Sequence, residues 1–291
     1  MDMAIGLPAT IPGVDGPALL AWAQRAEARG FSSLGVIDRL VYPNYEPLIA
    51  LTAAAAVTAR IRLTTAILIA PLRTNTALLA KQAASLDRLS GGRLVLGLAV
   101  GGREDDFAAS GADMHTRGTA FDQQLGELKR IWTEGREDWQ VAIGPRPARA
   151  GGPELIIGGQ ADVSFKRAAT HGSGWIMGGG TPDNFAGGLQ ALRQAWSAAG
   201  RTDTPRNIAL CYFALGPEGR SHADRYLQHY YAFMPQYVDI VAASAAVSEQ
   251  MVRGYADAFA AAGCDELIAF PCSAGLEQVD LLASAVAPYL R

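Results

Sequence analysis

The sequence predicts an α/β protein that folds as one (β/α)8 TIM barrel over residues 1–291. Short apolar runs alternate with segments of helical periodicity along the whole chain, and eight of each can be counted. The predicted strands are apolar throughout, which is typical of parallel strands buried on both faces. Both observations favour a barrel over an open doubly wound sheet. Two smaller domains would also fit 291 residues, but a barrel of this length is commonly a single domain.

The first half of the chain contains four predicted strands, at residues 4–8, 33–38, 62–69 and 94–100. The first helix places Leu19 and Trp22 on one face and ends at Gly30, a residue type that commonly terminates helices. Pro47 suits the first turn of an Ala-rich second helix, and a third helix covers about residues 74–89. The helix after the fourth strand carries one apolar stripe, formed by Phe121, Leu125, Leu128 and Trp132.

The second half repeats this alternation after a polar, Pro-containing insertion at about 134–153. Its strands are predicted at residues 154–159, 174–179, 207–215 and 266–272. Helices are predicted to begin near Asp162, Asp183, Ser221 and Ser248, and a last helix covers 277–290. One connection, about 219–262, holds more helix than a single return to the barrel needs.

The composition of the chain argues against several classes of binding partner and of site. The net charge is −3 with no Lys/Arg cluster, so we expect no nucleic-acid binding. No apolar run reaches the length that spans a bilayer, so we expect no membrane association. The start MDMAIGLPAT lacks the basic region of a secretion signal, which favours a cytoplasmic location. Three cysteines without metal-type spacing indicate reduced thiols rather than a disulfide framework or a zinc site.

Few reactive side chains are predicted at the strand ends, where barrel enzymes place their chemistry. The lysines all fall in predicted helices, which argues against a Schiff-base enzyme. The histidines fall on loops or helices, and Asp38 is the only acidic residue at a predicted strand end, so we expect no metal. A second carboxylate, Glu104, is poorly placed for glycoside hydrolysis.

Glycine follows three successive strands, as Gly101-Gly102, Gly158-Gly159 and Gly178-Gly179-Gly180. Glycines let backbone N–H groups approach a ligand, and a helix that begins directly afterwards adds its positive end, so phosphate is the expected ligand. Ordinary tight turns are the alternative interpretation. An apolar mouth with few acids or bases and a phosphate site suggests that a bound cofactor carries the chemistry.

One long stretch resembles a known family. It is LTTAILIAPLRTNTALLAKQAASLDRLSGGRLVLGLAVGGREDDFAASG at residues 63–111, and the likeness continues through HTRG, LIIGGQADVSFKRAA and HGSGWIMGG, covering about residues 4–185. These segments resemble the bacterial luciferase-like barrel family of flavin- and deazaflavin (F420)-dependent oxidoreductases and monooxygenases. The combination is specific for the family but not for a substrate.

The resemblance implies a cofactor site at the strand ends. Asp38 matches the acidic residue near the cofactor ring, and Arg39 stands where His or Gln is more frequent, so both are assigned as catalytic. The Ala66–Ile67 step matches a non-prolyl cis peptide that forms a bulge behind the ring, although strand propensity alone would favour a plain buried strand. Arg103, where Asn is frequent, could hold a phosphate or be a solvated surface charge. The implied cofactor-binding residues are Asp38, Ala66, Ile67, Gly101, Arg103, Asp105, Gly158, Gly159, Gly178 and Gly179.

An aromatic and Met cluster follows the seventh predicted strand, where family members place helices over the cofactor. The predicted substrate pocket comprises Tyr230, Phe233, Met234 and Cys272. Such side chains suit an apolar pocket, but helix packing or a dimer contact would use them equally well. The resemblance to this family also implies that the protein forms a homodimer.

The implied function is an oxidoreductase that uses reduced FMN or coenzyme F420 for hydride transfer or oxygen activation on a small organic substrate. Flavin has nitrogen at ring position 5 and its neighbouring carbon can bind oxygen, whereas the deazaflavin is a hydride carrier; the residues do not decide between them. A non-catalytic flavin-binding or partner-subunit protein of the same fold is the alternative. A non-redox phosphate-binding barrel enzyme is a third possibility.

Overall fold

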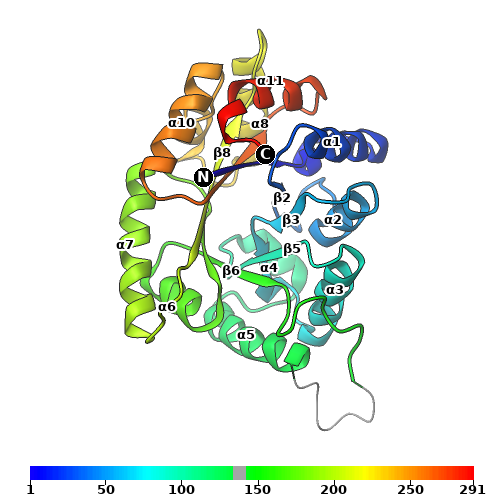
Figure 1. The fold of residues 1–291 in the computed structure, drawn as a ribbon, viewed down its shortest axis with the longest axis vertical. Coiled ribbons are helices and arrows are strands. Elements are labelled where there is room, and N and C mark those ends of the chain that lie inside the picture. Colours follow the sequence, from blue (N-terminus) through cyan, green and yellow to red (C-terminus); the bar gives the residue numbers. More distant parts are fainter. Residues whose placement is uncertain (134–141) are drawn as a thin grey trace.

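The structure is a computed structural model that describes residues 1–133 and 142–291, and it forms a closed barrel of parallel strands (Figure 1). The strand order is β3-β2-β1-β9-β8-β7-β6-β5-β4, and an additional pairing of β3 with β5 closes the ring. The strands are β1 (Asp2–Gly6), β2 (Ser33–Val36), β3 (Arg62–Thr65), β4 (Leu68–Ile69), β5 (Leu94–Ala99), β6 (Glu154–Gly158), β7 (Gly174–Met177), β8 (Arg206–Phe213) and β9 (Glu266–Pro271). Because β4 continues β3 after a break, the nine segments make the eight-stranded barrel that the sequence predicts.

Helices surround this barrel. The described α-helices are α1 (Gly16–Ala28), α2 (Pro47–Ala56), α3 (Thr76–Leu89), α4 (Glu104–Ser110), α5 (Arg117–Thr133), α6 (Asp162–His171), α7 (Pro182–Ala198), α8 (Gly219–Tyr230), α9 (Val238–Ala243), α10 (Glu249–Ala261) and α11 (Glu277–Ala285). Short 3-10 turns are η1 (Pro8–Thr10), η2 (Ala70–Leu72) and η3 (Ala287–Tyr289). The connection over 219–262 holds α8, α9 and α10.

Three predicted segments are wrong in detail. The third strand breaks at Ala66–Ile67, the loop after the fourth strand contains α4, and the last helix stops at Ala285 instead of residue 290. Pro288 lacks a backbone N–H and restricts the residue before it, which accounts for the early end of α11. The predicted insertion at 134–153 lies partly outside the described residues.

Side-chain caps start several helices where the sequence changes from strand to helix. Asp15 accepts a hydrogen bond from the backbone N–H of Ala18 at the start of α1, and Glu46 does the same for Ile49 at the start of α2. Ser248 caps α10 through the N–H of Met251. These caps satisfy backbone donors that the first turn of a helix leaves free.

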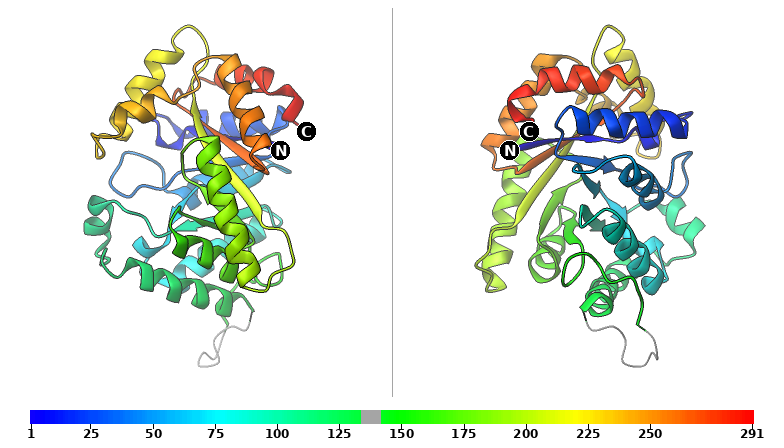
Figure 2. Two further views of the ribbon diagram at one scale, coloured as in Figure 1. Left: turned by 90° about the vertical axis from the view of Figure 1, so that its left-hand side faces the viewer. Right: turned by 45° about the vertical axis from the view of Figure 1, so that its right-hand side comes forward.

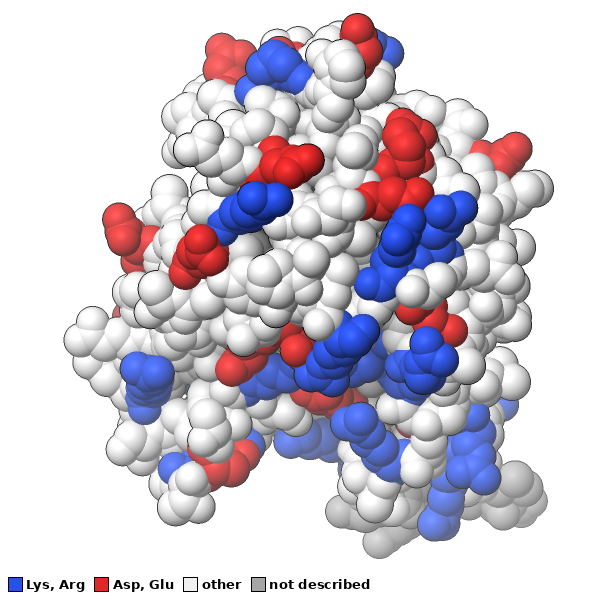
Figure 3. Space-filling model, turned by 45° about the horizontal axis from the view of Figure 1, so that its top comes forward, with Lys and Arg blue, Asp and Glu red and all other residues white. Residues whose placement is uncertain are grey.

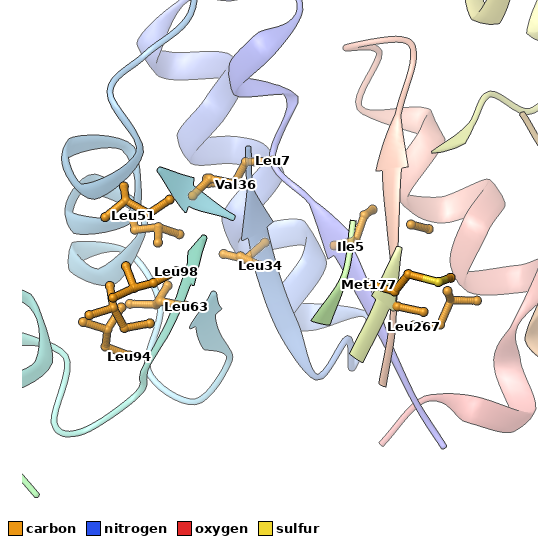
Figure 4. Close-up of a cluster of buried hydrophobic side chains, with 14 of the residues drawn as sticks. Ile5, Leu7, Leu34, Val36, Leu51, Leu63, Leu94, Leu98, Met177 and Leu267 are labelled. Atoms are coloured by element: carbon orange, nitrogen blue, oxygen red, sulfur yellow. The ribbon is translucent and has the colours of Figure 1, made fainter. Parts of the chain in front are cut away.

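Strand side chains alternate between two buried clusters. Ile5, Leu34 and similarly placed residues point outward and form one cluster with helix residues such as Leu51 of α2 (Figure 4). The strand residues that alternate with these, such as Ile156 of β6 and Ile268 of β9, belong to the second cluster and fill the barrel interior. Alternate residues of each strand therefore face either the surrounding helices or the barrel interior.

Phe270 fills the upper barrel interior because two neighbouring strands carry glycine. A Cβ atom on Gly6 would lie 2.3 Å from a ring carbon of Phe270, and one on Gly35 would lie 2.9 Å from another. Both distances are shorter than Cβ contacts in folded proteins allow. The absence of these side chains lets the fully packed Phe270 ring (2% exposed) close the barrel below its mouth.

The mouth lies at the carboxyl ends of the strands. The left view of Figure 2 shows the connection after β2, α4 and the α8–α9 region on one side of the barrel, with both chain ends on the other. On the face shown in Figure 3, acidic and basic side chains are intermingled. Within the described residues, the longest apolar helical stretch falls short of a membrane-crossing helix.

Gly6→Ala tests the packing of the barrel interior. We expect it to lower the free energy of unfolding by about 1–3 kcal/mol, because the added methyl group overpacks the Phe270 ring. Gly126→Ala is the control: its Cβ meets nothing within 4 Å on α5, and the change should stabilise the protein by about 0.5–1 kcal/mol. Urea denaturation of both variants measures the difference, and equal stability would contradict this account of Gly6.

Candidate functional site

Asp38 lies at the mouth just after β2 and is paired with an arginine that the sequence analysis did not single out. Its Oδ2 accepts hydrogen bonds from the backbone N–H of Ile69 (2.8 Å) and from Arg73 Nη1 (2.5 Å), and its Oδ1 accepts from Arg73 Nη2 (3.2 Å). Arg73 also donates to Glu46 (3.0 Å). Asp38 therefore ties the exit of β2 to the exit of β4.

Asp38 is buried and Arg73 is partly buried, with side-chain exposures of 2% and 20%, and each charge stabilises the other. Burial raises the pKa of Asp38, and Arg73 opposes that rise. Burial alone would lower the pKa of Arg73, but Asp38 and Glu46 together outweigh burial and the pKa is raised, so Arg73 stays charged. With both carboxylate oxygens occupied by Arg73, Asp38 is a poor candidate for free proton exchange with a ligand.

The break between β3 and β4 contains the cis peptide bond Ala66–Ile67. Ala66 remains anchored because its N–H donates to the carbonyl of Val36 (2.7 Å). The Ile67 side chain crosses the mouth: a Cβ on Gly158 would lie 2.2 Å from Ile67 Cδ1, and one on Gly178 would lie 3.9 Å from it. Gly158 thus makes room for Ile67 of the protein itself, which is a structural reason for this glycine that does not involve phosphate.

The other predicted glycines differ in the space around them. Gly101 (φ 72°) lies against Ile69, and Gly159 (φ 125°) lies against the Ser164 side chain, with added Cβ atoms 2.4 Å from each neighbour. A Cβ on Gly179 would meet nothing within 4 Å. Gly178 and Gly179 therefore border open space, whereas Gly101 and Gly159 are required by backbone conformation and packing.

The helices after these glycines differ in how their first turns are satisfied. At the start of α7, the Thr181 hydroxyl accepts a hydrogen bond from the backbone N–H of Asn184. The side-chain oxygen of Asn184 in turn accepts one from the backbone N–H of Thr181. For α6, whose N-cap residue is Ala161, no side chain of the described chain provides a cap. Of these two helices, α6 is therefore the one whose first turn has no side-chain cap, although the Ser164 N–H already donates to the Ala161 carbonyl (2.8 Å) and Asp162 lies in that turn.

The guanidinium groups of Arg39 and Arg103 lie against the same aromatic ring, that of Phe233. Arg39 donates to the carbonyl oxygens of Tyr230 (3.1 Å) and Val41 (2.9 Å), and its guanidinium lies 5.4 Å from the centroid of the Phe233 ring. The guanidinium of Arg103 lies 3.5 Å from the same centroid. Burial, with the nearby charge of Arg103, lowers the pKa of Arg39.

Acidic residues of α4 balance these two cations. Asp105 accepts from Arg103 Nη2 (2.6 Å) and lies 3.5 Å from Arg39. Asp106, also missed by the sequence analysis, accepts from the backbone N–H groups of Leu40 (3.1 Å) and Val41 (2.7 Å). Nη1 of Arg103 is buried and has no hydrogen-bond partner among the described residues.

The four predicted pocket residues do not line one cavity. Met234 lines a cavity of about 660 Å³ beside Gly178 and Gly179. Cys272 lines a separate cavity of about 430 Å³. Tyr230 is buried in the aromatic cluster that lies against Arg39, and Phe233, 41% exposed, covers Arg103. Burial raises the pKa of the Cys272 thiol, so this residue is an uncharged part of the wall.

The fold and this site place the chain in a known family. The model of the luciferase-like monooxygenase family matches residues 6–269, and the chain belongs to that family. An uncharacterized protein of Mycobacterium tuberculosis is 32% identical over 175 residues, 57% of this chain and 61% of the relative. The matched part thus spans about three fifths of that relative's length. A second uncharacterized protein of the same organism is 30% identical over 210 residues, 62% of this chain and 72% of the relative.

Solved structures share the whole fold at low sequence identity. An F420-dependent secondary alcohol dehydrogenase in complex with an F420-acetone adduct superposes with a TM-score of 0.80 at 16% identity, covering 100% of both chains. The monooxygenase RslO1 of Streptomyces bottropensis gives 0.77 at 22% identity, covering 99% of both. The FMN complex of the oxygenating constituent of 3,6-diketocamphane monooxygenase from Pseudomonas putida gives 0.72 at 17% identity, covering 100% of this chain and 99% of that one.

Arg73→Gln tests the buried ion pair. We expect a loss of about 3–5 kcal/mol in the free energy of unfolding near neutral pH, because Asp38 is left buried without its counter-charge. Removing Arg73 raises the pKa of Asp38 further above its unfolded value, so the loss should shrink as the pH falls and Asp38 takes up a proton.

Denaturation of three variants across a pH series checks this expectation. The double variant Asp38→Asn/Arg73→Gln should recover much of the lost stability. Arg29→Gln, which breaks an exposed pair with Asp280, should cost no more than about 1 kcal/mol at any pH. A loss for Arg73→Gln that is small or independent of pH would show that the pair is not what holds β2 to β4.

Proposed function

We propose that this chain is an oxidoreductase that binds reduced FMN or F420 at the barrel mouth and acts on a small organic substrate by hydride transfer or oxygen activation. The observation that carries the proposal is the buried Nη1 of Arg103, which has no hydrogen-bond partner among the described residues. Arg103 follows β5 and α6 follows β6, and these two strands are paired through Leu98 and Ile157. Arg103 and the first turn of α6, which has no side-chain cap, therefore follow neighbouring strands.

The residues at this position fit the phosphate-bearing tail that FMN and F420 share. Arg103 Nη1 is buried without a hydrogen-bond partner in the described chain, and a phosphate oxygen would supply one. The first turn of α6 has no side-chain cap, and its backbone N–H groups other than that of Ser164 would be open to such an anion. The self-capped α7 makes the loop at Gly178 and Gly179 better suited to border the ring or the substrate.

The chain's own side chains would shape the space around the ring. Ile67, which projects from the bulge across the mouth, would support the ring from the barrel side, and Met234 and Tyr231 of the 660 Å³ cavity would exclude water from the other. When bound, the flavin or deazaflavin supplies the electron pair for hydride chemistry.

Asp38 and Arg39 would have different roles in such a site. Asp38 acts as a positioning residue, because its pairing with Arg73 fixes the start of the bulge region. Arg39 is suited to donate hydrogen bonds to a polar substrate group rather than to transfer a proton, because a guanidinium stays protonated in proteins. The proton that reduction of a substrate takes up, or that its oxidation releases, would then be exchanged with water or with a group of the substrate.

Titration of the apoprotein with FMN and with F420, followed by fluorescence, tests the proposal. Binding of one of them supports it, and binding of neither would refute it. A cofactor that binds but is never oxidised faster by candidate substrates would favour the alternative role as a cofactor-binding or partner subunit. The expected homodimer is tested separately, by sedimentation of the same sample.

Arg103→Gln should weaken binding of that cofactor about tenfold or more, because a charge-assisted hydrogen bond to phosphate is lost. Arg193→Gln, an exposed arginine on α7, makes the same change in charge and should leave the affinity unchanged. Thermal melts of both variants check that the fold is kept. Equal affinities for the two variants would place the phosphate elsewhere.

A further inference from the structure

A second cavity lies at the same end of the barrel, on the side opposite to the glycine loops. It has a volume of about 430 Å³, within the range of small-molecule sites. Three segments enclose it: the loop after η1, one face of α8, and the loop after β9. The residues that line it are Ile11, Pro12, His222, Arg225, Tyr226, His229, Cys272, Ser273 and Ala274.

One wall of this cavity carries only basic side chains. His222, Arg225 and His229 are spaced three and four residues apart on α8, so they lie on one face of the helix. The described lining residues include no carboxylate. Asp224, on the same helix, is already paired with Arg220 at 3.0 Å.

Two of the three basic side chains of this wall lack a strong partner, whereas Nδ1 of His229 is hydrogen-bonded with the Tyr42 hydroxyl (2.7 Å). Arg225 makes only a 3.4 Å contact with the Ser221 hydroxyl and forms no ion pair with any described residue. Nδ1 of His222 is buried and has no hydrogen-bond partner within residues 1–133 and 142–291. By contrast, Arg253 on α10 is paired with Glu249 at 3.1 Å. An anion in the cavity would give the buried Nδ1 of His222 a partner and would pair with the exposed guanidinium of Arg225.

The opposite wall is uncharged and, apart from Ser273, mostly apolar. Ile11, Pro12 and Ala274 present carbon atoms to the cavity, and the buried thiol of Cys272 adds no charge. The hydroxyl of Tyr226 is occupied by the Thr10 hydroxyl at 2.6 Å, so the tyrosine offers the cavity its ring. A ligand that satisfies both walls carries a negative group at one end and an apolar body at the other.

We propose that this cavity binds a small organic carboxylic acid, with its carboxylate against His222 and Arg225 and its apolar body against Ile11, Pro12 and Ala274. A carboxylate accepts hydrogen bonds from both side chains, and a body of aromatic size fits the cavity volume. The proposal requires neither a bound cofactor nor turnover, so it stands or falls separately from the redox function.

Calorimetric titration of the apoprotein with benzoate, and with benzamide as its neutral counterpart of the same shape, tests the proposal. We expect benzoate to bind and benzamide to bind about tenfold more weakly. His222→Gln and Arg225→Gln should each weaken benzoate binding severalfold and change benzamide binding little. Ala274→Phe should abolish binding of both compounds, because the added ring occupies the apolar side.

Two control variants distinguish this cavity from other basic positions. Arg193→Gln makes the same charge change on α7 and should leave benzoate affinity unchanged. Arg103→Gln, at the barrel mouth, should also leave it unchanged. The proposal is overturned if benzoate does not bind, if His222→Gln and Arg225→Gln bind it as the wild type does, or if Arg103→Gln is the variant that loses it.

Discussion

The buried pair of Asp38 and Arg73 is the interaction on which the geometry of the mouth depends. It joins the exit of β2 to the segment after β4, on either side of the break in the third strand. Neither charge could remain buried without the other, so the two segments are held at one separation. The bulge between them then directs Ile67 across the mouth, and Gly158 is needed so that Ile67 can lie there. The ion pair thus lies next to the bulge that brings Ile67 against Gly158.

The barrel itself is predictable from the sequence because its signal is repeated. Each unit pairs a short apolar strand with a helix of clear periodicity, and eight repetitions outweigh an error in any one. The details that cannot be predicted from the sequence are those that depend on single residues. Nothing in the apolar run over residues 62–69 marks a break, because Ala66 and Ile67 are ordinary strand residues. The short helix α4 is hidden because its acidic first turn is equally typical of an exposed loop.

The site is less predictable because its contacts join segments far apart in the chain. Asp38 and the glycines can be selected as strand-end residues, and the resemblance to a family adds Arg103. Their partners follow no local rule: the hydrogen bonds of Arg73 with Asp38 and the position of Phe233 over Arg103 appear only after folding. The glycines show most clearly how far a site can be predicted from sequence. A phosphate loop and a turn that accommodates Ile67 require the same residue type at Gly158.

The plug that Phe270 forms with Gly6 and Gly35 determines the routes of exchange with solvent. Because packed side chains fill the cylinder beneath its rim, nothing can pass through the barrel from one pole to the other. Ligands can therefore enter and leave only on the side of the strand ends, where the cavities of about 430 and 660 Å³ lie. If the proposed cofactor and substrate both bind at this rim, the substrate has to approach the cofactor ring from the solvent side, because no route leads to the ring through the barrel axis.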